Sequence, residues 1–124
     1  MKELFLSFKK SIVQLQKILK QKKTVANRDS AIKRFELTFE LAWKSIQKFL
    51  QEQNKVICRS PKECLREAFG LGLIADDSRW LEALDDRNLT VHTYDEKVAD
   101  EVYSRLGRYL KLFEQFNESL NKFL

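Results

Sequence analysis

One eight-residue segment of this 124-residue sequence concentrates the side chains that can do chemistry. Between Arg87 and Tyr94 lie the only histidine of the chain, His92, and the amide side chain of Asn88. An arginine can hold a phosphate through its rigid fork of donors. A histidine can donate or accept a proton near neutral pH, and a tyrosine can stack on a base or offer its hydroxyl. These residue types suit the binding or cleavage of a nucleotide or a phosphodiester.

The spacing of these residues decides whether one helix can present them together. On a continuous helix, Arg87 and His92 would lie about 140° apart around the axis and would not meet at one phosphate. A helix that ends between them would bring them together, and so would two copies of the chain that meet at this segment. The β-branched pair Thr90 and Val91, followed by a candidate capping residue at Thr93, indicates that a helix ends here.

Two carboxylates upstream could support this segment. Glu36 and Glu40 stand at i and i+4 of a helical pattern, and either could reach Arg87 and His92 and orient them. The alternative that we favour is a pair of flanking carboxylates that form ion pairs with Lys33 or Lys44. A structural role competes for the whole segment as well, because a lone histidine near a helix junction usually makes hydrogen bonds within the fold.

The rest of the sequence offers little other chemistry. It contains no G-x-x-x-x-G-K phosphate loop and no recognisable serine triad. With one histidine, a metal site within one chain is not expected, and we expect neither a metal nor another cofactor. Cys58 and Cys64 form a C-x5-C pattern that is neither a redox motif nor a zinc site. We expect free thiols in a reducing cytosol, with Cys64 facing the core.

The basic composition is compatible with an anionic partner. The net charge is +5 and the pI is about 9.2, which would suit RNA, DNA, a nucleotide or an acidic protein surface. Many lysines fall in the first part of the chain, and we interpret them as the solvated face of a helix. No apolar run of about 18 residues could span a membrane. Lys9 and Lys10 interrupt any signal peptide, so we expect a soluble cytoplasmic protein.

Three long helices are predicted from hydrophobic periodicity. Apolar residues recur every three or four positions over residues 3–22, 29–53 and 94–124, which is typical of amphipathic helices. The chain has only three glycines and one proline, which also favours helices over a sheet with many turns. Gly107 interrupts the last helix, where it would allow a neighbouring helix to approach closely.

Two shorter helices are predicted from their end signals. Ser60-Pro61-Lys62-Glu63 reads as a capping box with proline at the first helical position, and Gly70 and Gly72 end that helix. The next helix starts near Asp76 and ends near Thr90 or His92. The last helix would then begin near Tyr94, behind a second capping box that runs from Thr93 to Glu96.

These elements predict an all-α protein, a four- to five-helix up-and-down bundle that forms a single domain over residues 1–124. The last helix carries more apolar residues than one stripe needs. We interpret the surplus as a second buried surface and expect a homodimer. The surplus residues are Tyr103, Leu110, Leu112 and Leu124.

Three blocks of the sequence resemble a known family. Residues 39–46 (FELAWKSI), 60–69 (SPKECLREAF) and 86–96 (DRNLTVHTYDE) are similar to the nucleotidyltransferase substrate-binding protein family, within the wider HEPN group of helical bundles. The resemblance implies a bundle that dimerises. It also implies a partner, a separate minimal nucleotidyltransferase that supplies the catalytic carboxylates and whose substrate or nucleotide the helical subunit binds.

A related HEPN branch implies a different activity. Its members are metal-independent endoribonuclease toxins with an R-x4-H-x-Y motif, which this sequence matches at Arg87, His92 and Tyr94. By this resemblance, Arg87 would stabilise the scissile phosphate and His92 would act on the ribose 2′-hydroxyl or the leaving oxygen. Tyr94 would accept AMP from the partner nucleotidyltransferase, and the modification would silence the toxin. We favour the non-catalytic binding subunit, with the ribonuclease second and a purely structural dimerisation module third.

Overall fold

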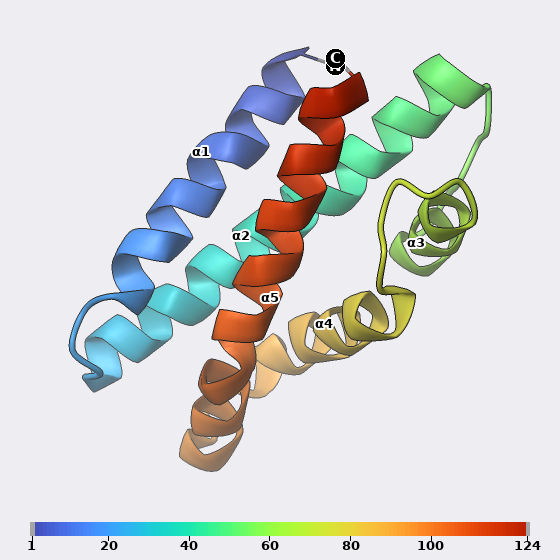
Figure 1. The fold of residues 1–124 in the computed structure, drawn as a ribbon. Coiled ribbons are helices and arrows are strands. Elements are labelled where there is room, and N and C mark those ends of the chain that lie inside the picture. The colour runs from blue at the N-terminus through green and yellow to red at the C-terminus, as the bar shows by residue number, and fades with distance from the viewer. Residues whose placement is uncertain (1, 124) are drawn as a thin grey trace.

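The computed structural model describes residues 2–123, which form helices joined by short turns, with no strand among these residues (Figure 1). The prediction of an all-α fold is therefore confirmed. The elements are α1 (Lys2–Leu19), α2 (Val25–Phe49), a short π-helix (Leu50–Asn54), α3 (Pro61–Gly70), α4 (Asp77–Leu89), a 3-10 turn (Thr90–His92) and α5 (Glu96–Phe123).

The helices follow an up-and-down path. In Figure 1, α1 runs down, α2 runs back up, α3 and α4 lead down again, and α5 returns upward between α1 and α4. The three long helices α1, α2 and α5 all contact one another, while α4 packs on α2, α3 and α5. The end of α4 therefore lies beside the first half of α2, and this arrangement places the predicted chemical segment next to Glu36 and Glu40.

Aromatic side chains fill the centre of the bundle. Trp80 of α4 contacts the rings of Phe113 and Phe116 edge to face, at centroid distances of 5.6 and 5.9 Å. Phe35 of α2 stacks on Tyr109 of α5 at 5.3 Å. All five side chains are buried. Burying a side chain of this kind contributes roughly 1.5–3 kcal/mol, so these contacts are a main source of stability for the bundle.

Helix ends agree with the capping signals at α3 and α4. Ser60 Oγ accepts a hydrogen bond from the Glu63 amide at 3.2 Å, and Asp76 Oδ1 accepts one from the Arg79 amide at 3.0 Å. The expected start of the second helix at residue 29 is wrong, because α2 begins at Val25. Thr24, in the predicted connection, caps the helix there.

Two expectations for the last helix are corrected. It starts at Glu96 rather than near Tyr94, because Asp95 Oδ1 accepts a hydrogen bond from the Lys97 amide at 2.9 Å. Thr93 does not cap it: its hydroxyl donates to the Thr90 carbonyl at 3.0 Å. No described atom lies within 4 Å of the place where a Cβ on Gly107 would be, so Gly107 serves no close helix approach.

The surplus apolar residues of α5 are accounted for within one chain. Leu112 is buried, and Tyr103 and Leu110 are partly buried against the core. Leu124 lies outside the described residues. The apolar face of α5 is wide because this helix packs against three others, α1, α2 and α4. The surplus residues do not require a second chain.

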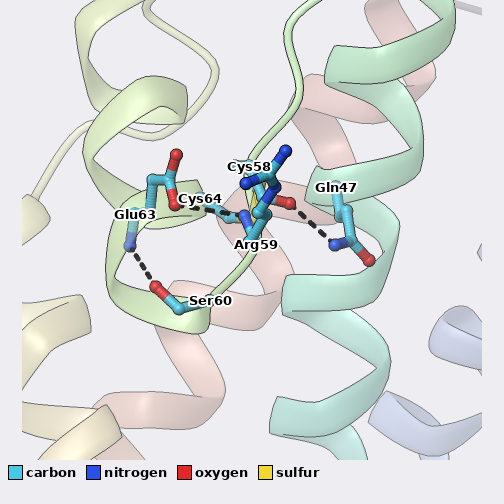
Figure 2. Close-up of a disulfide and its surroundings, with 6 residues drawn as sticks. All are labelled: Gln47, Cys58, Arg59, Ser60, Glu63 and Cys64. Carbon is cyan, nitrogen blue, oxygen red and sulfur yellow. Dashed lines mark hydrogen bonds between the residues drawn. A yellow bond between two sulfur atoms is a disulfide. The ribbon is translucent and has the colours of Figure 1, made fainter.

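The two cysteines form a disulfide, which corrects the expectation of free thiols. Cys58 lies in the extended segment before α3, and Cys64 lies one turn into that helix, with their Cα atoms 5.2 Å apart (Figure 2). This Cα separation is within the range that a disulfide needs. Both residues are buried, so the expectation that Cys64 faces the core is confirmed. Gln47 of α2 donates to the Cys58 carbonyl at 2.8 Å and joins this segment to α2.

Across residues 2–123, none of the helices has the length and apolar character needed to cross a membrane.

Candidate functional site

The segment from Arg87 to Tyr94 spans the end of α4, as its β-branched residues predicted. α4 ends at Leu89, and a 3-10 turn over Thr90–His92 follows. Threonine hydroxyls stabilise the turn: Thr90 donates to the Arg87 carbonyl at 2.6 Å and Thr93 to the Thr90 carbonyl at 3.0 Å. A 3-10 turn has fewer residues per turn than an α-helix. The residues after Leu89 therefore point in other directions than they would on a continued α4.

Arg87 points toward α2. Its guanidinium lies 3.8 Å from Glu40 Oε2, and its central carbon lies 5.6 Å from the centre of the Phe39 ring. Within residues 2–123, its buried Nε has no hydrogen-bond partner. Most buried polar groups in proteins are satisfied, which makes this donor unusual. The side chain as a whole is 30% exposed, so its accessible guanidinium donors can bind an external acceptor.

Both interpretations of Glu36 and Glu40 hold in part. Glu36 forms an ion pair with Lys33 at 3.6 Å, and Glu40 forms one with Lys44 at 3.4 Å, as the favoured alternative predicted. Glu40 also contacts Arg87 and accepts a hydrogen bond from the Trp43 indole at 3.0 Å. Glu40 is therefore in a position to orient Arg87, whereas the ion pair of Glu36 is local to α2.

Arg87 and both carboxylates line one cleft against α2. Its volume is about 490 Å³. The cleft is strongly charged, with three cations and two anions among its lining residues. Its walls are Ser30, Lys33, Arg34, Glu36, Leu37, Glu40 and Arg87. A cleft lined in this way suits a polar, anionic ligand better than an apolar one.

His92 and Tyr94 form a separate pair at the surface. The Nδ1 atom of His92 lies 3.3 Å from the hydroxyl of Tyr94, and their rings meet edge to face with centroids 5.9 Å apart. Tyr94 is 81% exposed, which leaves its hydroxyl accessible. Asn88 is exposed beside them. Among the hydrogen bonds and ion pairs of residues 2–123, none joins Arg87 to His92, so one chain does not bring these two together directly.

A buried carboxylate that the sequence interpretation missed anchors this segment. Asp86 accepts hydrogen bonds from Arg105 Nε and Nη2 at 2.7 and 2.8 Å and from the Tyr109 hydroxyl. Burial and the neighbouring carboxylates raise the pKa of Tyr109 well above its ordinary range, so its hydroxyl stays protonated as a donor. The sequence feature that could have indicated this burial is the helical spacing. Asp86 follows Trp80 and Ala83 at intervals of three on the buried face of α4.

A second unpredicted cluster joins the starts of α2 and α5. Arg28 is buried at 3% exposure and contacts Asp29 at 3.0 Å, Glu96 at 2.6 Å and Asp100 at 3.1 Å. The hydrogen bond from Arg28 lowers the pKa of Glu96, and hydrogen bonds from Lys23 and then Arg28 lower that of Asp100. This cluster fixes the first turn of α5, only a few residues beyond His92 and Tyr94.

No group of three or more histidine, cysteine, aspartate or glutamate side chains is placed to hold a metal ion in the part of the chain that the structure describes. The polar groups at the cleft are instead the guanidinium, ammonium, carboxylate and hydroxyl groups of its walls. These are the groups that proteins use to bind phosphates and sugars.

Comparison with known proteins identifies a family and related sequences. A family model described as "Nucleotidyltransferase substrate binding protein like" matches residues 3–122. A Haemophilus influenzae protein named "Probable ribonuclease HepT" is 38% identical over 84 residues, 64% of this chain. The match spans only 58% of the length of that relative.

Solved structures share the whole fold. A Thermus thermophilus protein has a TM-score of 0.84 at 38% identity, covering 88% of this chain and 94% of that one. A structure described as a tri-AMPylated Shewanella oneidensis HEPN toxin in complex with MNT antitoxin has a TM-score of 0.78 at 21% identity, covering 97% and 95%. At that lower identity the likeness is one of fold.

Proposed function

The chain belongs to the nucleotidyltransferase substrate binding protein-like family, and from this premise we propose that it is the helical, substrate-binding subunit of a two-component nucleotidyltransferase. The observation that carries this proposal is Arg87, which lines the α2 cleft with a side chain that is 30% exposed. A phosphate or nucleotide in the cleft would accept from its accessible guanidinium donors, and Glu40 would hold the guanidinium in place.

The residues that follow Arg87 complete the binding surface. Asn88, His92 and Tyr94 are exposed beside the end of α4 and offer an amide, an imidazole and an aromatic ring with a hydroxyl. An aromatic ring can stack on a base, and an amide can bind its polar edge. In this proposal Arg87 binds the phosphate and the other three contact the rest of the nucleotide.

We also propose that the chain acts as a homodimer through this segment. Leu89, Val91 and Tyr94 are exposed large side chains within six residues, at 39%, 73% and 81%. A cluster of exposed apolar residues on a rigid turn is typical of an interaction surface. A twofold contact here would bring His92 of the second copy toward Arg87 of the first and would join the two halves of the motif.

The partner in this proposal is a separate nucleotidyltransferase. Residues 2–123 display no cluster of carboxylates for metal-dependent nucleotidyl transfer, and the family is described by its relation to such an enzyme. The Shewanella oneidensis protein, which is similar in fold, is described in complex with an MNT antitoxin. A helical bundle of this shape can therefore form a stable complex with another protein.

The test is co-expression and co-purification with a minimal nucleotidyltransferase from the same genome. We expect a stable complex and nucleotide binding that Arg87→Ala weakens by about tenfold or more, because a charged donor to phosphate contributes about 1.5–3 kcal/mol. Arg66→Ala, at an exposed arginine of α3, is the matched control and should bind as the wild type does. If no complex forms with an intact partner, the binding-subunit proposal is wrong.

A metal-independent ribonuclease is the second candidate, favoured by the 3.3 Å contact between His92 and Tyr94 in a motif that already contains Arg87. In this reaction His92 takes the proton of a ribose 2′-hydroxyl and the 2′-oxygen attacks the adjacent phosphorus. The 5′-oxygen of the next nucleotide leaves with a proton, and a 2′,3′-cyclic phosphate remains. Arg87 stabilises the charge on the phosphorane oxygens.

Tyr94 would then be the regulatory residue. Its hydroxyl oxygen attacks the α-phosphorus of ATP on the partner enzyme, pyrophosphate leaves, and His92 can take the phenolic proton through the same 3.3 Å contact. The AMP group would add a negative charge and a base beside the site.

Two results would support this candidate. The chain would cleave RNA in EDTA, and His92→Ala would abolish the cleavage. Mass spectrometry would find AMP on Tyr94 after incubation with the partner and ATP. Intact RNA under the same conditions would count against it.

A further inference from the structure

A second hollow adjoins the α2 cleft. It lies between the last turns of α1 and the first half of α2 and has a volume of about 220 Å³. Ser30 and Arg34 line both this hollow and the cleft, so the two adjoin at these residues, and we call the pair of them the groove. The remaining walls of the hollow come from α1 and the turn after it. They are Gln14, Lys17, Ile18 and Gln21.

The charges in the two halves of this groove differ. In the cleft, Lys33 is paired with Glu36 and Arg87 with Glu40. The hollow has no acidic residue among its walls, and its two cations are Lys17 and Arg34. Neither takes part in an ion pair within residues 2–123, and both are exposed. Their charges are therefore uncompensated by the protein and available to an external anion.

We propose that Lys17 and Arg34 form a second phosphate subsite, so that the groove binds a ligand with at least two separated phosphates. This inference deepens the proposed function and rests on it for the first phosphate, the one bound by Arg87. The second subsite lies outside the Arg87–Tyr94 segment and takes its residues from α1 and α2.

The placement of Lys17 and Arg87 sets the size of the ligand. Lys17 of α1 lines only the hollow, and Arg87 of α4 lines only the cleft. A ligand that contacts both cations therefore needs a phosphate in each half of the groove. The phosphate chain of a nucleoside triphosphate and successive phosphodiesters of a single-stranded oligonucleotide both offer two. Gln14, Gln21 and Ser30 supply neutral hydrogen-bonding groups to phosphate oxygens or sugars at the same subsite.

The test measures binding of AMP, ATP and a short single-stranded RNA to the whole chain by calorimetry and fluorescence anisotropy. The variant Lys17→Gln removes the cation of the subsite that lines only the hollow and leaves the walls of the cleft intact. We expect it to weaken ATP or RNA binding by about tenfold and to lower the salt slope by roughly 1 if RNA is the ligand. AMP, with one phosphate, should bind the variant as it binds the wild type.

A matched control separates the subsite from general charge. Lys10→Gln removes the same charge from an exposed position of α1 outside the groove, and far-ultraviolet circular dichroism checks that both variants fold. If the control weakens binding as much as Lys17→Gln does, the subsite is refuted. Equal loss for AMP and the longer ligands refutes it too. If only Arg87→Ala abolishes binding, the subsite fails and the proposed function stands. If only Lys17→Gln abolishes it, the role of Arg87 fails instead.

Discussion

At the scale of single residues, Asp86 determines where Arg87 points. Its carboxylate is 3% exposed and receives two donors from Arg105 and one from Tyr109 of α5. This arrangement fixes the rotation of α4 about its axis. Because Arg87 is the next residue on that helix, its side chain is directed about 100° away from the core contact of Asp86, toward α2.

Replacing Asp86 should therefore cost stability, not only function. Asp86→Ala leaves Arg105 and Tyr109 without their shared acceptor, and we expect a loss of about 3 kcal/mol in the free energy of unfolding. Asp85→Ala is the matched control, since Asp85 is exposed and its loss should change stability by less than about 0.5 kcal/mol. Urea denaturation followed by circular dichroism measures both. Equal stabilities for the two variants would contradict this role of Asp86.

Sequence reasoning found the exposed polar residues of the candidate site more readily than the buried ones. Arg87 and Glu40 were selected by type and spacing, and the structure places them in contact. Asp86 and Arg28 were missed because a buried charge is recognised by its partners, and those partners lie on α5, far away in the sequence. The helix end between Arg87 and His92 was predicted, but the expectation that it would bring the two side chains together was wrong, because a 3-10 turn follows α4.

At the scale of the elements, the Arg28 cluster connects the first turn of α5 to the start of α2. Glu96 and Asp100 have pKa values below their ordinary values of 4.5 and 3.8 in the folded state. Their contribution to stability is complete above those ordinary values. It is lost as the pH falls through the lowered pKa values of the folded protein, because the unfolded chain binds protons first.

Removal of Arg28 should reduce this sensitivity to acid. In Arg28→Met, the carboxylates lose the cation that lowers the pKa of Glu96 most strongly, so the drop in unfolding free energy between about pH 7 and about pH 3 should be smaller than in the wild type. Arg108 lowers the pKa of Glu82 in both proteins, so Glu82 contributes the same acid sensitivity to the wild type and to Arg28→Met. Arg34→Gln, at an exposed arginine of the same helix, should keep the wild-type slope. A slope in Arg28→Met equal to that of the wild type would disprove the linkage.

The disulfide attaches α3 to the segment that leaves α2. It closes a short loop, since Cys58 and Cys64 are separated by 6 positions in the sequence, and the loss of chain entropy in the unfolded state corresponds to about 2 kcal/mol. We expect a dithiol reductant to lower the free energy of unfolding of the wild type by that amount. The variant Cys58→Ala/Cys64→Ala should show no effect of the reductant. A wild type that is equally stable with and without reductant would be the contrary result.

Helices were predicted more reliably than their ends and cross-links. The 3.6-residue periodicity of apolar residues identified the long helices, and the cap at Ser60 placed the start of α3 correctly. The start of α5 was misplaced because Thr93 and Asp95 are both good capping residues, and only the turn geometry before them decides between the two. The disulfide was missed because its formation depends on the extended path from Cys58 to Ser60.

At the scale of the whole molecule, the two most exposed large hydrophobic residues lie where the candidate site is. Val91 and Tyr94 are more exposed than any other large hydrophobic residues of the described chain, at 73% and 81%. Both follow Arg87 on the 3-10 turn or just beyond it. Because Tyr103, Leu110 and Leu112 of α5 are buried or partly buried within one chain, we propose this turn rather than α5 as the surface that a second copy would cover.

Introducing a charge at Val91 should therefore dissociate the proposed homodimer without unfolding the chain. Val91→Glu places like charges near each other across a twofold axis, and we expect dimer affinity to fall at least about tenfold. Val25→Glu is the matched control: Val25 is 61% exposed at the start of α2, away from this turn, so this variant should remain dimeric. Sedimentation equilibrium measures the association, and circular dichroism confirms the fold.

Because the dimer is proposed to bring His92 of one copy toward Arg87 of the other, Val91→Glu should also lose any RNA cleavage. A wild type that is monomeric at micromolar concentration would refute the dimer, and a dimeric Val91→Glu would place its interface elsewhere.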